Sequence, residues 1–380
     1  MEYRMKIAVI GAGEIAEVAY LENLHNPERG YEVAYVCDKD AERLRWAKSA
    51  CPAAKMTSSF DDVLADPAVN WVFILTPLLT HAPIAKKALA AGKNVFTEKP
   101  LSIDFDKAAS VVSLAKKKGL TVASAPIMLL YPAKEYVRSL ILGGAIGHVA
   151  ATRVIVAHGG PNRWERATDS GIYFRKEMAG WCAPLPDLAV YGLSYLSHVF
   201  GPARRISAMA TLAVKERTID KVTAPGFKPY TMKPTIKDNV TVNIEYGEGR
   251  LVTIHANFVT PAWHMDRYEF FGTEGMISLP YKAVYAKIQS SVAPFNAPEA
   301  LHDLDLAGKN GGARFSGVNW GPIVAQHLKK AAELSAEPLI GADFTLHIVE
   351  LISKAMKSAR TGIAEKLTTK FKRDPKWNLA

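Results

Sequence analysis

Residues 6–16 read KIAVIGAGEIA, and this stretch decides the fold. Lys6–Ile10 is a short apolar run without alternation, which predicts a strand buried on both faces of a parallel sheet. Gly11-Ala12-Gly13 ends the run, and apolar residues at helical spacing follow from Glu14 to Leu24. The glycines therefore lie at a predicted strand-to-helix turn, which is the context that a dinucleotide-binding turn requires.

The small residues of this turn have distinct physical tasks. Gly11 permits the tight turn, and Gly13 lets the backbone approach a pyrophosphate, whose charge the N–H groups at the helix start bind. Ala16 stands where a third glycine often stands, and an alanine still allows close packing of helix on sheet. The predicted cofactor-binding residues of the turn are Gly11, Ala12, Gly13, Glu14 and Ile15.

A carboxylate at the end of the next predicted strand indicates which dinucleotide binds. Val33–Cys37 ends in Asp38, at the position where the hydroxyl groups of the adenosine ribose lie. Asp38 would repel a 2′-phosphate, so NAD is predicted and NADP is less favoured, although Lys39 and Arg43 nearby weaken the distinction. Asp38 and Lys39 join the cofactor-binding set. The alternative is a surface aspartate that opens a helix.

Two further apolar runs complete the pattern of the first 125 residues. Trp71–Leu75 leads into Thr76-Pro77 and a helix from about His81 to Ala91, and Asn94–Thr97 leads into Glu98-Lys99-Pro100. Strands that alternate with helices predict an α/β domain, residues 1–125, with a doubly wound parallel sheet. Ligands of such sheets bind at the carboxyl ends of the strands, where these polar residues fall.

The chain changes character at His148, after a helix predicted from Ala133 to Leu142. Alternating segments follow, clearest in Leu251–Val259, where every second side chain is apolar. Gly247–Arg250 is typical of a hairpin turn. We predict an α+β domain over residues 126–360 with a large, mostly antiparallel sheet, which binds substrate and forms oligomers. Residues 361–380 are predicted to form a loose basic tail.

Composition favours a globular, cytoplasmic protein. Hydrophobic residues make up 49% and charged residues 22% of the 380 residues. No apolar run approaches the roughly 18 residues that a membrane span needs, and no secretory signal is apparent. Cys37, Cys51 and Cys182 match no disulfide or zinc pattern, so buried reduced thiols and no metal site are expected.

The net charge of +10 raises the question of nucleic acid binding. Between Lys354 and Lys376 there are eight basic and two acidic residues, so +6 of the charge lies in one C-terminal segment. A solvated tail is the favoured interpretation, a nucleic-acid-binding arm the alternative. We expect no nucleic acid partner.

With these motifs the chain resembles the glucose-fructose oxidoreductase and inositol dehydrogenase family, often written Gfo/Idh/MocA. The resemblance extends over most of the chain, and its most specific part is the Glu-Lys-Pro segment. It rests on the following stretches: Gly11-Ala12-Gly13-Glu14-Ile15-Ala16, Asp38, Thr76-Pro77 with His81, Gly92 to Leu101, and Asp187 to Tyr191. The resemblance implies an NAD-dependent oxidoreductase that forms a homodimer or a homotetramer. It also implies that further residues contact the cofactor, namely Thr76, Pro77, His81, Glu98 and Lys99.

The family resemblance implies a catalytic role for Lys99. The corresponding lysine lies beside the nicotinamide and the reacting carbon, where an ammonium group can hydrogen-bond the substrate oxygen and stabilise alkoxide character. Pro100 resembles a proline that the family often has in the cis form. The alternative is a surface lysine in a loop.

The distal motif departs from the family pattern. Three glycines are replaced by Trp181-Cys182-Ala183 and the usual histidine by Tyr191, while Asp187 remains. Asp187 and Tyr191 are four residues apart and share one face of a predicted helix. We interpret Tyr191 as the proton carrier, with Lys99 favouring its phenolate, and Asp187 as a residue that orients substrate hydroxyls. Ordinary packing of Tyr191 is the alternative.

An irregular stretch before this helix is rich in rings and guanidinium groups. Aromatic rings stack on sugar faces, and arginines pair with acidic groups. The candidate substrate residues are His158, Arg163, Trp164, Tyr173 and His264. Solvated surface roles for the arginines and a structural role for His158 at a strand end are the alternatives.

The leading functional hypothesis is NAD-dependent oxidation of a secondary hydroxyl of a sugar, glycoside or cyclitol. An NAD-dependent glycoside hydrolase, which oxidises a ring carbon transiently, eliminates the aglycone and reduces the ring again, is the alternative. Net formation of NADH separates the two. A dinucleotide sensor without catalysis is a third hypothesis, against which Lys99, Asp187 and Tyr191 argue.

Overall fold

The computed structural model describes residues 3–163, 165, 169–176, 180–224, 226–260, 267–280, 286–290, 302–304 and 320–378. The chain forms two compact units. Unit 1 comprises Met1–Ile127, Ala313–Val349 and Lys370–Ala380, and unit 2 comprises Met128–Gly312 and Glu350–Thr369. The units are interleaved along the chain, whereas the sequence predicts consecutive domains that meet at residues 125 and 360.

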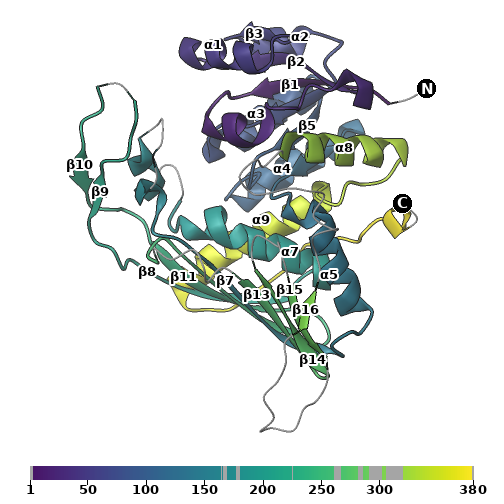
Figure 1. The fold of residues 1–380 in the computed structure, drawn as a ribbon, viewed down its shortest axis with the longest axis vertical. Coiled ribbons are helices and arrows are strands. Elements are labelled where there is room, and N and C mark those ends of the chain that lie inside the picture. The colour runs from purple at the N-terminus through teal and green to yellow at the C-terminus, as the bar shows by residue number, and fades with distance from the viewer. Residues whose placement is uncertain are drawn as a thin grey trace. The chain divides into compact units, whose positions relative to one another are not determined.

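Unit 1 contains a six-stranded parallel sheet in the order β3-β2-β1-β4-β5-β6, drawn in purple and blue in Figure 1. Its strands are β1 (Met5–Ile10), β2 (Tyr31–Cys37), β3 (Lys55–Thr57), β4 (Trp71–Ile74), β5 (Asn94–Thr97) and β6 (Val122–Ser124). This order is that of a dinucleotide-binding Rossmann fold and confirms the predicted doubly wound sheet. The strand order reverses between β1 and β4, so a ligand crevice is expected at their carboxyl ends.

Three helices of unit 1 begin at a residue whose side chain caps their free N–H groups. The helices of unit 1 are α1 (Ala41–Ala50), α2 (Phe60–Ala65), α3 (His81–Ala90), α4 (Phe105–Lys118), α8 (Trp320–Glu333) and the first part of α9 (Ala342–Thr361). Asp40, Ser59 and Asp104 accept hydrogen bonds from N–H groups in the first turns of α1, α2 and α4. Such caps fix where each helix starts, and hence where the strand-to-helix turns lie.

The helix predicted from Glu14 to Leu24 is shorter than expected. The structure has a π-helical segment, Ala16–Tyr20, in which Leu21 N donates to Ala16 O over 2.8 Å. A turn follows, with Asn23 at a φ of 64°. The wide π turn brings Tyr20 fully into the core, which a regular helix spacing did not indicate.

Unit 2 contains a nine-stranded sheet in the order β16-β15-β14-β13-β7-β12-β11-β8-β17. Only the β7–β12 pair is parallel within this sheet, which confirms the mostly antiparallel prediction. The strands are β7 (Val149–Ala157), β8 (Arg205–Thr211), β11 (Asn239–Glu245), β12 (Leu251–Asn257), β13 (Arg267–Gly272), β14 (Gly275–Pro280), β15 (Ala286–Ser290), β16 (His302–Leu304) and β17 (Glu365–Lys366). A separate two-stranded sheet joins β9 (Arg217–Ile219) to β10 (Tyr230–Met232).

The alternation of β12 is as predicted, because Val252, Ile254 and Ala256 are buried while the residues between them keep exposed surface. Glu245 pairs with Leu251 across the predicted hairpin turn. The helices of unit 2 are α5 (Pro132–Leu142), the π-helical segment Leu185–Ala189 and α7 (Val190–Phe200), with short 3-10 segments at Met128–Leu130, Pro161–Arg163 and Ser170–Phe174.

Helix α7 packs against the inner face of the nine-stranded sheet at Gly192. A Cβ atom there would lie 3.1 Å from Ile254 Cδ1 and 3.3 Å from Val154 Cγ1, so the helix backbone directly meets β12 and β7. A larger residue would push the helix away from the sheet.

The C-terminal segment is not the loose tail that the sequence predicts. In unit 2, β17 pairs with β8, and the carboxylate of Glu350 accepts hydrogen bonds from the N–H and hydroxyl groups of Thr368 and Thr369. In unit 1, the ring of Phe371 packs edge-on against Phe344. The tail is held because its alternate residues point inward, a pattern that the run of lysines conceals.

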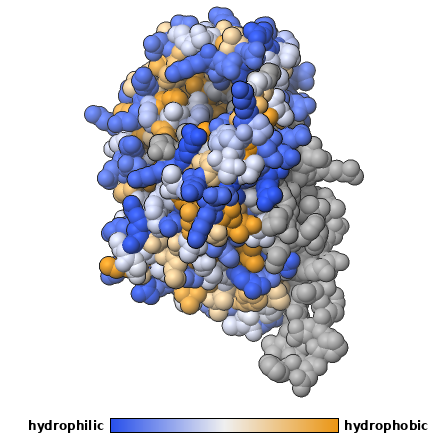
Figure 2. Space-filling model, turned by 90° about the vertical axis from the view of Figure 1, so that its left-hand side faces the viewer, coloured by the Kyte–Doolittle hydropathy of each residue, from blue (hydrophilic) through white to orange (hydrophobic). Residues whose placement is uncertain are grey.

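Cys37, Cys51 and Cys182 are buried and unpaired, as expected. Hydrophilic side chains predominate on the face of the molecule in Figure 2, with hydrophobic residues in small groups between them. Within the part of the chain that the structure describes, no helix is long and apolar enough to cross a membrane.

Glu350 makes the stability of the C-terminal segment depend on acid pH. Burial raises the pKa of Glu350, but hydrogen bonds from Lys354, Thr369 and Thr368 outweigh it and lower the pKa from 4.5 to about 2. The stabilisation is therefore complete above pH 4.5 and is lost as the pH falls towards 2. We predict that Glu350→Gln lowers the melting temperature at pH 7. In this variant the melting temperature should also fall less steeply than in the wild type as the pH is lowered from 4.5 towards 2, as measured by calorimetry. Glu365→Gln in β17 is the matched control, and an equal effect of both variants contradicts the prediction.

Candidate functional site

The glycine turn after β1 lies at the carboxyl edge of the parallel sheet. Gly11 has a φ of 97°, and a Cβ atom on it would lie 2.9 Å from the carbonyl oxygen of Leu75 at the end of β4. A Cβ atom on Gly13 would meet nothing within 4 Å. Gly11 is therefore required by the turn itself, whereas Gly13 leaves open space above the backbone, where a pyrophosphate can approach.

Asp38, at the end of β2, faces this turn. Its Oδ2 accepts a hydrogen bond from Ala12 N over 2.7 Å, and its Oδ1 accepts one from Asp40 N over 2.9 Å. Arg43, which might have attracted a 2′-phosphate, pairs instead with Glu17 over 3.1 Å. Open space at Gly13 and a carboxylate beside the turn fit NAD, because Asp38 would accept hydrogen bonds from the ribose hydroxyl groups of NAD.

The other predicted cofactor residues lie around the same sheet edge of unit 1. Glu14 and Ile15 are half-buried at the start of the helical segment, Thr76 is half-buried after β4, and Pro77 and Lys39 are exposed. Thr80 Oγ1 donates to the carbonyl oxygen of Pro77 over 2.7 Å, which closes the turn after β4. The structure thus gathers these residues at the strand ends.

Lys99 follows β5 in a turn that is held by two buried side chains, those of Glu98 and Tyr20. Glu98 N donates to Ile74 O of β4, and the carboxylate of Glu98 accepts a hydrogen bond from Lys99 N over 3.0 Å. The Lys99–Pro100 peptide bond is cis, as the family resemblance implies. Glu98 is buried and Lys99 is half-buried.

Tyr20 is the second support of this turn, and sequence reasoning missed it. Its hydroxyl donates to Glu98 Oε1 over 2.5 Å, and its ring contacts those of Phe96 and Trp320. Tyr20 belongs to the π-helical segment that starts beside the glycine turn. A buried hydrogen bond between Tyr20 and Glu98 therefore links the segment after the glycine turn to the Lys99 turn.

His81 links the turn after β4 to the Lys99 turn. Its Nδ1 lies 2.8 Å from the carbonyl oxygen of Pro100, and its Nε2 lies 2.7 Å from that of Thr76. Burial lowers the pKa of His81, against the opposite effect of the two carbonyl oxygens. The ring is only 1% exposed, so it holds the two turns together through their backbones and has little surface to offer a cofactor.

Asp187 and Tyr191 lie on one face of the helical stretch that leads through α7 in unit 2. From Cys182 to Val199, all of which the structure describes, they alone are not buried. Asp187 N donates to Ala183 O over 3.1 Å at the start of this stretch. The helix therefore presents a carboxylate and a phenol together, which is the pair that the sequence predicts.

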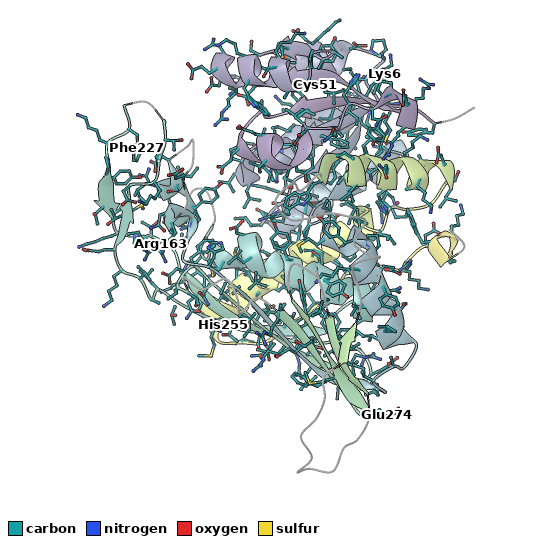
Figure 3. All side chains as sticks on the ribbon, in the orientation of Figure 1. Lys6, Cys51, Arg163, Phe227, His255 and Glu274 are labelled. Carbon is teal, nitrogen blue, oxygen red and sulfur yellow. The ribbon has the colours of Figure 1, made fainter. Side chains whose placement is uncertain are left out.

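The substrate loop, residues 157–176, carries three of the predicted substrate residues in its described part. His158 is buried, stacks on the ring of Phe258 at 4.8 Å and accepts a hydrogen bond from Gly160 N at Nδ1. Arg163 is exposed beside the β9–β10 sheet, as Figure 3 shows, and Tyr173 is half-buried. Trp164 and His264 lie outside the described residues.

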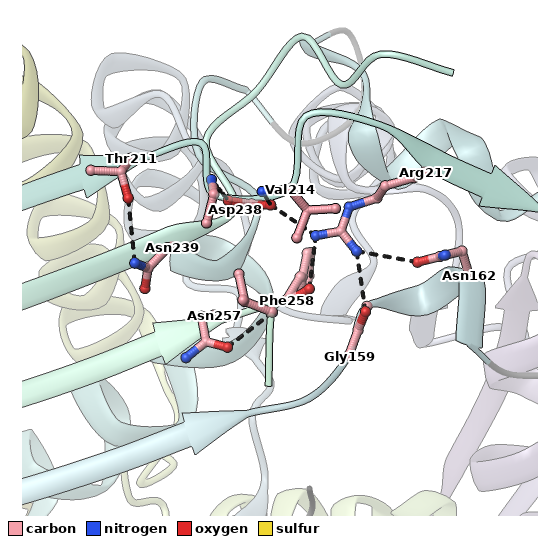
Figure 4. Close-up of polar contacts among 12 residues, drawn as sticks. Gly159, Asn162, Thr211, Val214, Arg217, Asp238, Asn239, Asn257 and Phe258 are labelled. Carbon is pink, nitrogen blue, oxygen red and sulfur yellow. Dashed lines mark hydrogen bonds and ion pairs between the residues drawn. The ribbon is translucent and has the colours of Figure 1, made fainter. Parts of the chain in front are cut away.

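A buried ion pair between Arg217 and Asp238 lies next to the substrate loop and was not anticipated from the sequence (Figure 4). Arg217 is the first residue of β9, and Asp238, 21 positions further along the chain, immediately precedes β11. No local pattern marks such a pair. Only an aspartate just before a predicted strand, Asp238 before β11, was available as a signal.

The hydroxyl of Tyr20 can be tested by a one-atom change. Tyr20→Phe leaves a buried carboxylate oxygen without its donor, which costs about 1–3 kcal/mol in the free energy of unfolding. The matched control is Tyr31→Phe in the same unit, because the Tyr31 hydroxyl meets only the amide of Gln326, at 3.3 Å. Urea unfolding measures both, and an equal loss in the two variants contradicts the role given to Tyr20.

Comparison with known proteins begins with curated relatives. The chain is 26% identical over 242 residues to an uncharacterised oxidoreductase of Synechocystis, a match covering 63% of this chain and 62% of that protein. It is 28% identical over 257 residues to trans-1,2-dihydrobenzene-1,2-diol dehydrogenase of Bos taurus, covering 67% of each. The chain thus spans about three fifths to two thirds of the length of these relatives.

Among solved structures, the fold is similar to that of a levoglucosan dehydrogenase in complex with NADH and levoglucosan. The TM-score is 0.80 at 19% identity, and the match covers 96% of this chain and 100% of that one. At this identity the likeness concerns the fold alone.

Two family models match consecutive parts of the chain. One, described as an oxidoreductase family with an NAD-binding Rossmann fold, matches residues 5–125. The other, described as the GFO/IDH/MocA C-terminal domain, matches residues 135–278. Together with the strand order of unit 1 and the mostly antiparallel sheet of unit 2, these matches show that the chain belongs to the Gfo/Idh/MocA family of NAD-binding oxidoreductases.

Proposed function

We propose that this protein oxidises a secondary hydroxyl group of a sugar, glycoside or cyclitol by hydride transfer to NAD. One observation carries the proposal: Lys99 stands at the carboxyl edge of the Rossmann sheet, in a turn held by Glu98 and His81. Two buried side chains that fix the backbone around a half-exposed lysine are expected for a catalytic lysine, and a purely structural lysine does not require them. NAD supplies the hydride acceptor.

Lys99 is proposed to bind the reacting oxygen of the substrate. As the carbon loses hydride, negative charge develops on that oxygen, and an ammonium group that is already in place stabilises it. The hydrogen bond from Lys99 N to Glu98 and the contact of Pro100 O with His81 fix the backbone on both sides of the lysine. The side chain therefore loses less freedom when substrate binds.

Tyr191 is proposed to take the hydroxyl proton, and Asp187 to orient neighbouring hydroxyl groups. Both are half-exposed on a helix whose other residues are buried. A phenol titrates at about 10 when unperturbed, so proton transfer near neutral pH needs a cation that favours the phenolate. The motif-based hypothesis assigns this role to the ammonium group of Lys99.

Three arguments support a sugar-like substrate. Tyr173 and Arg163 of the substrate loop offer a ring and a guanidinium group, which suit a pyranose face and an acidic substituent. Asp187 suits a compound with several hydroxyl groups. A relative, trans-1,2-dihydrobenzene-1,2-diol dehydrogenase, and a structural neighbour, levoglucosan dehydrogenase, are both named for hydroxylated ring compounds.

Lys99→Met and Tyr191→Phe test the assignment. With NAD and a panel of levoglucosan, trans-1,2-dihydrobenzene-1,2-diol and cyclitols, the wild type is expected to form NADH. Lys99→Met should lower kcat/KM by about 10³-fold or more, because a charge that acts in the transition state is lost. Tyr191→Phe should lower kcat and remove the acidic limb of the pH–rate profile, because the rise of activity with pH follows formation of the Tyr191 phenolate. NAD affinity, measured by calorimetry, should change less than about twofold in both.

Near-wild-type turnover of Tyr191→Phe would sink its role as proton carrier. Release of a sugar from a glycoside without accumulation of NADH would instead favour the hydrolase. Tight NAD binding without turnover on any compound would favour a sensor.

The outward face of the nine-stranded sheet is proposed to join subunits in a homodimer or homotetramer. Leu251, Ala151 and Phe271 stand side by side on β12, β7 and β13. Leu251 is 62% exposed and Phe271 is 38% exposed. A row of apolar residues across three strands of an uncovered sheet face is typical of an interaction surface.

Leu251→Lys places a charge in this row and should shift the oligomer towards monomer, measured by size-exclusion chromatography with light scattering. Leu142→Lys is the matched control, since Leu142 is 54% exposed at the end of α5. A monomeric wild type, or an unchanged mass of Leu251→Lys, contradicts the proposal.

A further inference from the structure

The Arg217–Asp238 ion pair lies at the ends of β7, β11 and β12 (Figure 4). Arg217 Nη2 donates to Asp238 Oδ2 over 2.8 Å, and the two residues expose 4% and 0% of their surface. Asp238 also accepts hydrogen bonds from Ala213 N and Val214 N, over 2.7 and 3.0 Å. Desolvation of two charges is costly, so such a pair persists where further hydrogen bonds satisfy both groups.

Arg217 also donates from Nη1 and Nη2 to the substrate loop and the end of β12, whereas its buried Nε has no hydrogen-bond partner in the described part of the chain. Nη1 donates to Gly159 O over 3.1 Å and to Asn162 Oδ1 over 3.4 Å, and Nη2 donates to Phe258 O over 2.7 Å. The guanidinium carbon lies 4.5 Å from the centre of the Phe174 ring. A planar fork makes these contacts at once, and a lysine ammonium cannot.

Each contact with the loop is made to the chain neighbour of a predicted substrate residue. The three pairs of neighbours are Gly159 with His158, Asn162 with Arg163, and Phe174 with Tyr173. Arg217 therefore contacts the residues next to the predicted substrate residues through one backbone oxygen and two side chains.

The loop closes directly on the guanidinium group at Gly160. Its φ is 105°, and a Cβ atom there would lie 2.7 Å from Arg217 Nη1 and 2.8 Å from Asn162 Oδ1. The Asn162 side chain also donates from Nδ2 to Thr218 O over 3.1 Å. A side chain at position 160 would therefore have to displace the guanidinium group or Asn162.

The Asp238 side of the pair reaches the helix that carries Asp187. Lys237 N donates to Trp181 O over 2.9 Å, and Ala183 N donates to Lys237 O over 3.3 Å. Ala183 O in turn accepts the hydrogen bond from Asp187 N. Asp238 is thus one residue away from a backbone ladder that ends in the first turn of the Asp187 helix.

We propose that Arg217 and Asp238 are positioning residues for substrate binding, which hold the substrate loop and the first turn of the Asp187 helix in one geometry. The inference rests on the proposed function because it takes this loop to bind the substrate. The pair acts through its neighbours and touches neither the substrate nor the cofactor.

The test compares two arginine-to-lysine variants of the full chain. Arg217→Lys keeps a positive charge opposite Asp238 and removes the fork. It should speed amide hydrogen exchange in residues 158–163 and 170–176 and raise KM for the active compound of the panel by about tenfold, with kcat and NAD affinity changed less than about threefold. Arg153→Lys is the control, because Arg153 pairs with Glu269 over 2.6 Å on the outward sheet face. It should change none of these quantities.

A second variant covers the case in which Arg217→Lys does not fold. Asn162→Ala keeps the ion pair and removes one loop contact, so it should raise KM and loop exchange in the same direction but less. Unchanged loop exchange or an unchanged KM in the folded variant overturns the proposal, as does an equal change in Arg153→Lys.

Failure of the proposed function reads differently. If the wild type binds NAD but oxidises no compound, the proposed function fails. Calorimetry of levoglucosan binding to the NAD complex, together with loop exchange, then decides the positioning role: weaker binding with faster exchange in Arg217→Lys supports it, and no difference from the wild type overturns it.

Discussion

The carboxylate of Glu98 is the group on which the rest of unit 1 depends. One oxygen accepts from Tyr20, in the segment that follows the glycine turn, and the other accepts from the backbone of Lys99. Glu98 N is itself bonded to the end of β4. A buried carboxylate is stable only when its lone pairs are satisfied, so it forces these three parts of the sheet edge into one arrangement.

In unit 2, a buried ion pair holds segments at the strand ends together, as Glu98 does in unit 1. Arg217 and Asp238 take charge out of water and in exchange hold irregular backbone at the strand ends, where no sheet hydrogen bonds are available. In both units a buried charged group holds the backbone of a loop that carries candidate site residues. Rigid backbone and accessible side chains are what a catalytic site requires.

Much of the fold was predictable because it depends on local patterns. The apolar runs of β1 and β4 and the alternation of β12 each reflect the faces that these strands bury. Lys99, Asp187 and Tyr191 were found through motif spacing, and the structure places each on an accessible turn or helix face. Their roles remain proposals.

What the sequence did not reveal depends on contacts between distant residues. Tyr20 and Glu98 are 78 residues apart, and the π turn that brings them together has no spacing signature. The C-terminal segment is held by hydrogen bonds from Thr368 and Thr369 to Glu350, which is 18 and 19 residues away in the sequence. The lysines of this segment, taken alone, suggested a loose tail. Such pairs become visible only when tertiary structure brings them together.

The central claim is that Lys99 holds the reacting oxygen of a polyhydroxylated substrate. A crystal structure of the protein with NADH and the active compound of the panel tests it most directly. We expect Lys99 Nζ to lie about 3 Å from one hydroxyl oxygen of the bound substrate. A substrate bound with that oxygen away from Lys99, or bound only outside the substrate loop and the Asp187 helix, would contradict it.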